Sequence, residues 1–579
     1  MSLATTSAGH PADPKHIGDN VLPNFPIFNR LLYLAGQSTQ IAINDVTYGH
    51  KATYAQLLSD VLHVRNDLRK RLCPSVHAQL LRGERVSINL IAPGGYEFST
   101  ALLATLAIGA VIVPISVAVP LEEALYFAST CQSAALLCSS NLSAFAEQLA
   151  RRIQEARNPE FVSMAIRPSI CKPLTSPQNI VISSDHYLDY HGPGLAIFTS
   201  GTSGPPKCAV KRRSFLDQNA KAITDWYGLK ESDVVLHTLP VHHATGIGIS
   251  FIPFLLAGAT IEFQSSGFKP DQIWERWRQG GLTVFSGVPT MYIRLMRHFE
   301  DVLSKRPDVN AYVQSAAAFR LMMSGSAALP FSLQKNWSKL LNGKRILERY
   351  GATEFSSVFS VKPGDSHNPD GSVGKVFFGL EVKLSNGDEG EILVKSPHMF
   401  TEYMFDPKAT TAAFTPDGFY KTGDIARKEG DYYFILGRAS IDILKSGGYK
   451  ISALDIEREI LNLPYISEVT VVGVDDDEYG QRVAAVVVLR DGVSTKLERE
   501  YIVHLLTFKW QVPSLSLERL RMDLREHLAR YKMPTLLRVV GELPKSSSGK
   551  VVKRQLKKLL FPDQGHPDIQ LWKSRKQKF

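Results

Sequence analysis

The chain has 579 residues, of which 44% are hydrophobic and 21% are charged, and its formal net charge is +10. Because a single hydrophobic core stops growing at roughly 250–300 residues, this length predicts at least two domains. The ordinary globular composition excludes a disordered chain, and five cysteines without a Cys-x-x-Cys pair favour reduced thiols over a disulfide framework or a zinc site. The basic residues are spread along the chain, which argues against a nucleic-acid-binding face.

Strand patterns alternate with helical patterns along the first three quarters of the chain. In chain order they predict strand Arg85–Ile91, helix Tyr96–Ile108, strand Val111–Val117, helix Leu121–Thr130, and strands Ala135–Cys138, Gly194–Phe198, Val234–Leu239, Thr260–Phe263 and Thr283–Gly287. Strands separated by helices are typical of βαβ units. This region is therefore predicted to be α/β, with a mostly parallel sheet.

The pattern changes after Gly387, where short strands are separated by turn residues. Strands are predicted at residues 390–394 and 432–436, followed by helix Ala453–Leu463 and strand Val469–Val474. We therefore expect an α/β fold with a large N-terminal region of layered α/β subdomains, a β-rich segment and a small α+β C-terminal domain. The predicted domains are residues 1–436 and 437–579. Residues 494–514 of the second are interpreted as a surface insertion or as an artefact of the predicted gene structure.

A phosphate-binding loop is predicted directly after the strand that ends at Phe198. Its residues are Thr199, Ser200, Gly201, Thr202, Ser203 and Gly204, followed by two prolines and Lys207. Glycines let successive backbone N–H groups point at one anion, hydroxyls add donors, and the lysine adds a positive charge. This chemistry suits a polyphosphate, although the same composition also occurs in flexible linkers. The spacing differs from that of a Walker loop, which argues against a P-loop kinase or GTPase.

Further motifs follow this loop along the chain. They are Leu239-Pro240-Val241-His242-His243-Ala244-Thr245-Gly246, Ser324-Gly325-Ser326-Ala327, Glu348-Arg349-Tyr350-Gly351-Ala352-Thr353-Glu354, Tyr420-Lys421-Thr422-Gly423-Asp424, Gly437-Arg438 and Pro544-Lys545-Ser546-Ser547-Ser548-Gly549-Lys550. With these motifs the chain resembles the adenylate-forming acyl-CoA synthetases, from about Phe25 to Leu560. Members of this family use ATP to join a carboxylic acid to coenzyme A through an acyl-adenylate.

The resemblance implies a nucleotide site built from most of these motifs. It implies that ATP contacts Ser324, Gly325, Ser326, Arg349 and Gly351, and that adenine stacks on Tyr350. It also implies that Asp424 holds the ribose and that Arg438 is a second contact to the ribose or to a phosphate. It also implies that Glu354 and Thr202 bind Mg²⁺ and that Thr353 bonds to a phosphate. Activation of an acid by ATP needs cations and in-line positioning against charge repulsion, and these residue types can supply both.

The last motif and a glycine-rich stretch are implied to act in turn. Lys550 is implied to bridge the oxygens of the forming acyl phosphate. The stretch with Lys445, Gly447 and Gly448 is implied to line the path of the CoA thiol after the small, mobile C-terminal domain has rotated. Ser440 falls where the hinge of the family usually carries Asp or Lys, so this hinge departs from the family pattern.

Within the family the chain is most similar to the malonyl-CoA synthetases, in residues 323–330, 347–351 and 447–449. A dicarboxylic acid needs a cation for its distal carboxylate, because an unpaired buried charge is costly. Arg294 falls where those enzymes place that cation, although an exposed arginine on an amphipathic helix fits the sequence equally well. His243 is implied to shape and gate the acyl pocket, where Thr245 and Ala352 replace larger residues of the subfamily. A substituted malonate or a short- to medium-chain acid is therefore an alternative to malonate.

We expect an AMP-forming acid–thiol ligase that uses ATP, Mg²⁺ and coenzyme A and acts as a monomer or homodimer. Two alternatives stay open: an adenylating enzyme that loads the phosphopantetheine of a carrier protein, and an inactive nucleotide-binding relative. No apolar run is long enough to cross a bilayer, so we expect no membrane span. Because the basic residues are spread along the chain, we also expect no nucleic-acid partner. The termini have no secretory, mitochondrial or peroxisomal signal pattern, which predicts a cytoplasmic location.

Overall fold

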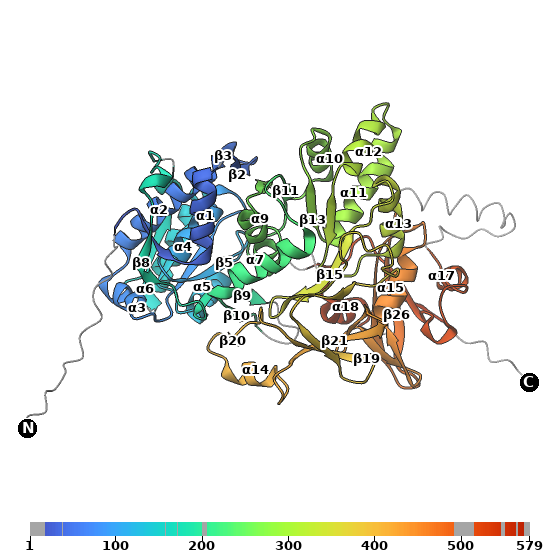
Figure 1. The fold of residues 1–579 in the computed structure, drawn as a ribbon. Coiled ribbons are helices and arrows are strands. Elements are labelled where there is room, and N and C mark those ends of the chain that lie inside the picture. The colour runs from blue at the N-terminus through green and yellow to red at the C-terminus, as the bar shows by residue number, and fades with distance from the viewer. Residues whose placement is uncertain are drawn as a thin grey trace, which may run out of the picture.

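Two large sheets, with helices between them and on their outer faces, make up most of the chain in the computed structural model (Figure 1). The structure describes residues 18–37, 39–156, 158–170, 172–199, 205–490, 515–545, 551–562 and 566–572. A short parallel pair, β1 (Val21–Asn24) and β8 (Val181–Tyr187), lies outside these sheets.

The first sheet has seven strands in the order β20-β10-β9-β5-β4-β6-β7. Their bounds are β4 (Ser87–Ile91), β5 (Val111–Ile115), β6 (Ala135–Cys138), β7 (Val162–Ala165), β9 (Pro193–Thr199), β10 (Lys207–Arg212) and β20 (Glu402–Tyr403). The strands from β9 to β7 are parallel, whereas β10 runs antiparallel to both of its neighbours. Successive side chains of β5 point to opposite faces, so Ile112 packs into the central core and Val111 and Val113 pack on the outer helices.

The second sheet has nine strands in the order β17-β16-β15-β14-β13-β11-β12-β2-β3. Their bounds are β2 (Ile41–Asp45), β3 (His50–Thr53), β11 (Val234–His237), β12 (Thr260–Phe263), β13 (Val284–Gly287), β14 (Leu321–Ser324), β15 (Leu347–Ala352), β16 (Ser356–Ser360) and β17 (Lys375–Val376). The strands from β2 to β15 pair in parallel, and β3, β16 and β17 add antiparallel edges.

The helices form layers between and outside these sheets. Between them lie α1 (Pro26–Gln37), α2 (Tyr54–Arg71), α4 (Tyr96–Ala107), α7 (Arg213–Tyr227), α8 (Ala244–Gly248) and α9 (Ile252–Ala257). The outer face of the first sheet is covered by α5 (Leu121–Thr130) and α6 (Ser143–Ala156). Val76 of α3 (Pro74–Leu81) packs into the core between the sheets. The outer face of the second is covered by α10 (Pro270–Arg278), α11 (Pro289–Asp301), α12 (Val309–Ala317) and α13 (Phe331–Leu340).

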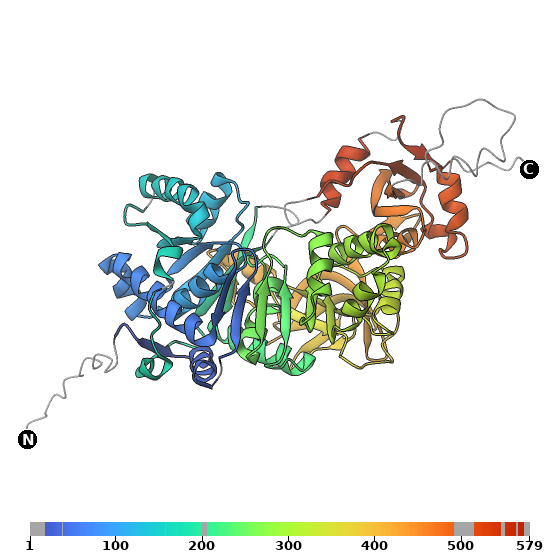
Figure 2. The same cartoon turned by 90° about the horizontal axis from the view of Figure 1, so that it is seen from above.

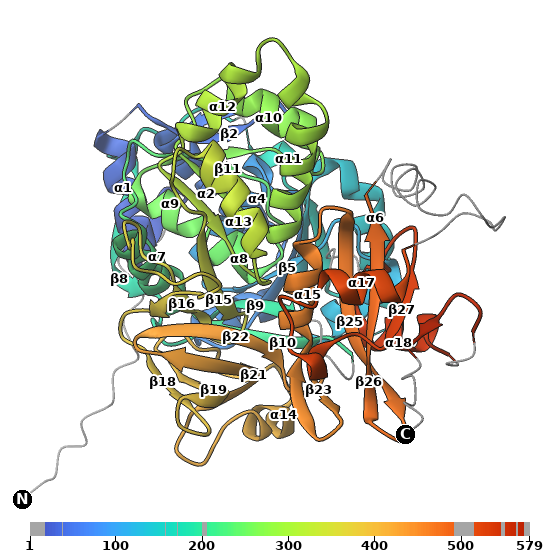
Figure 3. The same ribbon diagram turned by 90° about the vertical axis from the view of Figure 1, so that its right-hand side faces the viewer.

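The remaining elements form an antiparallel sheet and then a smaller unit with cores of its own (Figures 2 and 3). The antiparallel sheet contains β18 (Glu381–Leu384), β19 (Glu389–Lys395), β21 (Tyr420–Glu429) and β22 (Tyr432–Arg438), with α14 (Pro407–Ala412) beside it. The smaller unit contains the hairpin β23 (Ile443–Ser446) and β24 (Tyr449–Ser452), helices α15 (Ala453–Leu461), α17 (Leu517–Asp523) and α18 (Lys553–Leu560), and a sheet of β25 (Ile466–Asp476), β26 (Gly480–Leu489), β27 (Leu536–Val539) and β28 (Gln570–Leu571).

The expected fold class is confirmed, and the boundaries of several elements differ. The strand predicted to reach Val117 ends at Ile115, because a turn from Ser116 to Val119 leads into α5. The helix predicted to reach Leu463 ends at Leu461, where Asn462 caps it. The predicted insertion at residues 494–514 lies outside the described residues. In the part of the chain that is described, none of the helices has the length and apolar character needed to cross a membrane.

Candidate active site

The motif that contains Glu354 forms a tight turn between β15 and β16. A Cβ atom on Gly351 would lie 2.0 Å from the carbonyl oxygen of Ser356, so only glycine fits there. The Glu354 carboxylate accepts a hydrogen bond of 2.9 Å from the Tyr403 hydroxyl, which lies 3.2 Å from the Tyr420 hydroxyl. Burial, and then the charge of Glu354, raises the pKa of both tyrosines, so both hydroxyls stay protonated and can donate. Thr353, the predicted phosphate contact, belongs to the same turn.

The three residues predicted to hold the nucleoside lie together. Asp424 of β21 stands opposite Arg438 of β22 in the strand register. The Arg438 Nε atom donates a 2.9 Å hydrogen bond to Asp424 Oδ1, and the Tyr350 hydroxyl donates one of 2.7 Å to Asp424 Oδ2. The Tyr350 ring stacks on Phe359, with ring centroids 5.6 Å apart. A carboxylate fixed by a cation and a phenol keeps further lone pairs for other donors.

The neighbouring strands β14 and β15 contain buried polar atoms that have no hydrogen-bond partner among the described atoms. Ser324 ends β14, and Ser326 has a φ of 70°, in the left-handed region. A Cβ atom on Gly325 would lie 2.9 Å from Cγ of Arg349, so this glycine lets the arginine approach the backbone. Among the described atoms, the Ser324 hydroxyl and both terminal nitrogens of Arg349 are buried without a hydrogen-bond partner. Buried donors normally have partners, so these atoms fit a ligand with acceptor groups.

The two ends of the predicted phosphate loop are neighbours across the β9–β10 pair, where Thr199 stands opposite Lys207. The Thr199 hydroxyl donates a 3.3 Å hydrogen bond to the Lys207 carbonyl oxygen. The Lys207 ammonium lies 5.0 Å from the ring centroid of Tyr403, the residue whose hydroxyl reaches Glu354. The structure therefore brings the cation of this loop to the motif that contains Glu354.

A buried lysine that the sequence analysis did not identify lies behind Glu354. The Lys211 ammonium donates hydrogen bonds to the backbone carbonyl oxygens of Glu354 and His398, at 3.1 and 2.7 Å. Burial lowers the pKa of Lys211 to about 7. Alternation along the strand could have identified it, because side chains two or four residues apart in a strand share a face, and Lys211 therefore lies on the same face as Lys207.

The predicted acyl-pocket residues lie on three different elements. His243 caps α8, and its ring lies 4.3 Å from that of His242, whose pKa is lowered to about 3 by burial and then by His243. Thr245 lies in α8, and Ala352 ends β15. Arg294 lies on α11 with an exposed side chain, and its guanidinium is stacked 5.1 Å from the ring centroid of Phe268.

The predicted thiol-path residues form the hairpin of β23 and β24. Gly447 and Gly448 are its two turn residues, with φ of 56° and 83°, a conformation that favours glycine at both positions. The Lys445 backbone N–H donates a 2.8 Å hydrogen bond to Oε1 of Gln481, while its side chain is exposed.

The predicted hinge is connected to α18 by half-buried charges. Ser440 is exposed, and two residues later the Asp442 carboxylate accepts a 3.0 Å hydrogen bond from the Arg438 backbone N–H. The Lys553 ammonium lies 2.6 Å from Asp442 Oδ1 and 2.7 Å from Glu457 Oε1. The predicted site residues Ser200, Gly201, Thr202, Ser203, Gly204 and Lys550 lie outside the described residues.

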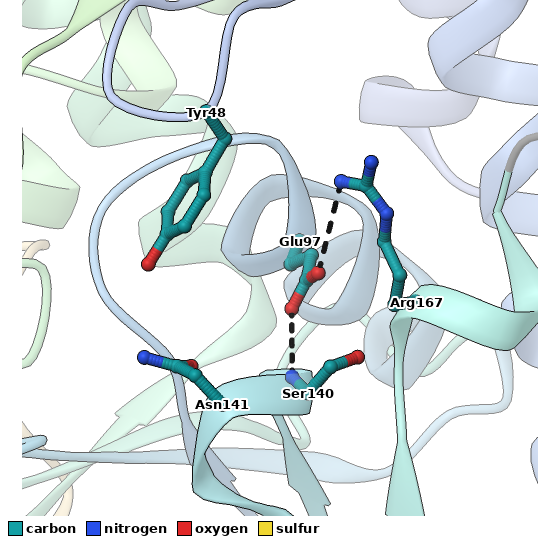
Figure 4. Close-up of a pocket in the computed structure, with 5 residues that line it drawn as sticks. All are labelled: Tyr48, Glu97, Ser140, Asn141 and Arg167. Carbon is teal, nitrogen blue, oxygen red and sulfur yellow. Dashed lines mark hydrogen bonds and ion pairs between the residues drawn. The ribbon is translucent and has the colours of Figure 1, made fainter.

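A cavity of about 250 Å³ lies elsewhere, at the carboxyl ends of β4, β6 and β7 (Figure 4). Its lining residues are Tyr48, Glu97, Ser140, Asn141 and Arg167. The Glu97 carboxylate accepts a 3.3 Å hydrogen bond from the Ser140 backbone N–H and lies 4.0 Å from the Arg167 guanidinium. Burial raises the pKa of Glu97. No motif residue lines this cavity, so it is separate from the candidate site.

Comparison with known proteins identifies the family. The family model for AMP-binding enzymes matches residues 34–404, and the model for the AMP-binding enzyme C-terminal domain matches residues 455–550. The chain is 35% identical over 498 residues to a malonate–CoA ligase of Arabidopsis thaliana, covering 83% of this chain and 78% of the relative. It is 31% identical over 571 residues to the human mitochondrial malonate–CoA ligase ACSF3, covering 93% and 92% of the two chains.

Solved structures have the same architecture. The crystal structure of ATP-bound MatB from Rhodopseudomonas palustris is 26% identical, with a TM-score of 0.74 and coverage of 92% of this chain and 98% of that one. A ternary product complex of a malonyl-CoA ligase with methylmalonyl-CoA and AMP is 27% identical, with a TM-score of 0.57 and coverage of 89% and 99%. The resemblance expected from the motifs is thereby confirmed, and the chain belongs to the AMP-binding enzyme family.

Proposed function

We propose that this enzyme is an ATP-dependent acid–CoA ligase. It forms an acyl-adenylate with release of pyrophosphate, and then an acyl-CoA thioester with release of AMP. The observation that carries the proposal is the cluster of Tyr350, Asp424 and Arg438, which holds a carboxylate in place for the ribose hydroxyls. Arg349 precedes Tyr350 on β15, and Ser324 ends the neighbouring strand β14. Their unsatisfied donors fit the same nucleotide. Relatives named CoA ligases support the reaction.

In the first step an oxygen of the acid attacks the α-phosphorus of ATP, and the bond to pyrophosphate breaks. Lys207 and the loop before it would bind the phosphates, and Thr353 would donate to one of them. Glu354 and Thr202 would hold Mg²⁺, which binds one or two carboxylates together with substrate phosphates and neutralises their charge. Lys550 would stabilise the charge that develops on the acyl phosphate, and Asp424 would orient the nucleoside.

In the second step the thiol attacks the acyl carbonyl, and AMP leaves. The hairpin with Lys445, Gly447 and Gly448 would line the path of the CoA thiol, since glycines at its turn leave room for a narrow chain. His243 would shape the acyl pocket.

We propose that the acid is malonate or a close analogue. Relatives in Arabidopsis thaliana and Homo sapiens are named malonate–CoA ligases. Arg294 would bind the distal carboxylate, since its exposed guanidinium can leave the Phe268 ring for a stronger anionic partner. The smaller side chains of Thr245 and Ala352 would also allow a substituted malonate.

The reaction is tested with purified protein, ATP, Mg²⁺ and equal concentrations of malonate, methylmalonate and C4–C10 monoacids. We expect acid-dependent pyrophosphate release and CoA-dependent AMP formation. Lys550→Ala should lower adenylation by roughly 10²–10³, as removal of an oxyanion-type donor does. Lys545→Ala is the matched control, because Lys545 pairs with Glu468. Nucleotide binding without pyrophosphate release from any acid would contradict the proposal, and transfer only to a carrier protein would change the acceptor.

The substrate is tested with Arg294→Ala, which should abolish the preference for malonate while monoacid activity remains. The control is Arg306→Ala, which removes another exposed arginine that is stacked on an aromatic ring. A preference for monoacids in the unaltered enzyme would contradict a malonate pocket.

The cytoplasmic location stays a prediction. Relatives from Mus musculus and Homo sapiens are named mitochondrial, so cell fractionation of the full chain is the deciding measurement.

A further inference from the structure

Lys211 is a buried cation with an unusual set of partners. Its exposed fraction is 0%, and none of the ion pairs found among the described residues includes it. Its ammonium donates to the carbonyl oxygens of Glu354 and His398 and lies 4.5 Å from the ring centroid of Phe215. Burial of a charge is costly unless its donors are satisfied. An uncharged side chain of similar size would fill the same space without that cost, so packing alone does not account for a lysine here.

The place of Lys211 in β10 explains what its charge can reach. Val210 and Cys208 point to the core under α5 and α6, whereas Lys207, Ala209 and Lys211 share the opposite face. At one end of this face Lys207 lies over the Tyr403 ring, whose hydroxyl binds the Glu354 carboxylate. At the other end Lys211 holds the backbone of the same glutamate. Strand β10 therefore contacts the Glu354 backbone directly through Lys211, and it reaches the Glu354 side chain only indirectly, through Lys207 and Tyr403.

The Glu354 carbonyl oxygen has a second donor, the Phe400 backbone N–H at 2.6 Å. With that hydrogen bond alone, the peptide group that follows Glu354 could still tilt about the one contact with Phe400. The Lys211 ammonium adds a bond from another direction and ties the turn to the His398 carbonyl oxygen. Small errors in the placement of a reacting or ligand group are costly in catalysis, because orientation contributes strongly to the rate.

We infer that Lys211 is a positioning residue for adenylation, which fixes the Glu354 backbone so that the carboxylate points to the hydroxyl of Tyr403, over whose ring Lys207 lies. This inference rests on the proposed function, in which Glu354 acts at the phosphates. It concerns only the first half-reaction, since the proposed thiol path uses the separate β23–β24 hairpin.

The test compares Lys211→Met, Lys211→Gln and the control Arg212→Gln, which alters the exposed neighbour at the end of the same strand. Acid-dependent ATP–pyrophosphate exchange gives kcat and KM for adenylation, and preformed acyl-adenylate with CoA reports the second half-reaction. For Lys211→Met we expect a kcat of adenylation about tenfold lower, a KM for ATP within about twofold and an unchanged second half-reaction. Lys211→Gln, which still donates, should lose less than Lys211→Met, and Arg212→Gln should lose nothing. If Lys211→Met does not fold, Lys211→Gln decides: a small loss confined to adenylation supports the inference, and a loss shared by both half-reactions overturns it.

Glu354→Gln separates the two proposals. If Lys211 acts through Glu354, Lys211→Met should add no further loss in the Glu354→Gln background, whereas independent effects would multiply. Multiplying losses would overturn the inference. An unchanged adenylation rate in Glu354→Gln would instead contradict the role of Glu354 in the proposed function. A loss in Glu354→Gln with full activity in folded Lys211→Met would overturn the positioning role alone.

Discussion

At the scale of single residues, the Asp424 carboxylate has partners of different chemistry. Arg438 supplies a charge-assisted hydrogen bond to one oxygen, and Tyr350 supplies a neutral donor to the other. A carboxylate can accept about four hydrogen bonds, so both oxygens keep capacity for ribose hydroxyls. The fixed orientation means that little freedom is lost when a nucleotide binds.

The Tyr350 hydroxyl should therefore contribute to ATP affinity. Tyr350→Phe keeps the ring on Phe359 and removes only the hydrogen bond to Asp424. Because hydrogen bonds to charged groups contribute about 1.5–3 kcal/mol, we expect the KM for ATP in pyrophosphate exchange to rise by roughly tenfold, with a smaller change in kcat. Tyr432→Phe is the matched control, since it removes a hydroxyl bonded to Asp365. Equal KM values for the two variants would contradict this role.

Glu348, in the same motif, should make stability depend on pH. Burial raises its pKa to about 7, and the charge of Asp370 adds to this increase. The hydrogen bond from the Leu329 backbone N–H and the charges of Arg458 and Arg345 lower the pKa but do not outweigh burial. A raised pKa means that the folded state binds the proton more tightly than the unfolded chain. The stabilisation is thus complete below pH 4.5, the ordinary value, and is lost as the pH rises through about 7.

The measurement is urea unfolding of the wild type and Glu348→Gln at pH values from 5 to 8. We expect the wild type to lose stability relative to this variant by on the order of 2 kcal/mol over that range. Glu381→Gln, an exposed glutamate on β18, should show no such trend. Parallel curves for the wild type and Glu348→Gln would show that Glu348 has an ordinary pKa.

At the scale of elements, the turn between β15 and β16 depends on one glycine. Gly351→Ala would place a methyl group 2.0 Å from the Ser356 carbonyl oxygen, so the turn must open. Overpacking of this kind lowers the free energy of unfolding by about 1–3 kcal/mol, so we expect a lower unfolding temperature. We also expect a large loss of adenylation activity, because the opened turn would displace Glu354. Gly36→Ala on α1 is the control, because nothing lies within 4 Å of the added atom. Full activity in Gly351→Ala would mean that this turn does not position Glu354.

Much of the arrangement of elements could be predicted from the sequence, because strand and helix periods and glycine positions are local signals. Tyr350, Asp424 and Arg438 were identified from motifs, and the structure brings them into contact. The contact of Lys211 with Glu354 spans 143 residues and depends on how β10, β20 and the β15–β16 turn meet, which no local pattern gives. For Arg294 the sequence left two orientations open, because an amphipathic helix alone does not decide where a long side chain ends.

At the scale of the whole molecule, the C-terminal unit lies beside α11 (Figure 3), and polar contacts connect the two. The Arg297 guanidinium donates to the Ser467 carbonyl oxygen, and the Arg490 guanidinium lies 3.4 Å from Glu300 Oε2. Both members of the second pair are more than one third exposed, with side-chain exposures of 41% and 36%. Exposed ion pairs contribute only about 0–1 kcal/mol. Contacts this weak can be exchanged for others, as the rotation predicted for the C-terminal domain would require.

Reversal of one charge should therefore loosen this docking without unfolding either part. In Glu300→Lys, repulsion from Arg490 replaces the attraction. We expect trypsin to cut within residues 437–450 about 2–5 times faster at low salt. The reason is that the loss of about 1 kcal/mol of docking energy raises the population of undocked C-terminal units by roughly fivefold. At about 0.5 M salt the difference should shrink, because the screening length falls well below its value of about 10 Å at 0.1 M. Asp301→Lys makes the same charge change at the next position of α11 and is the control. Equal cleavage of the two variants would show that the Arg490–Glu300 pair does not hold the C-terminal unit in place.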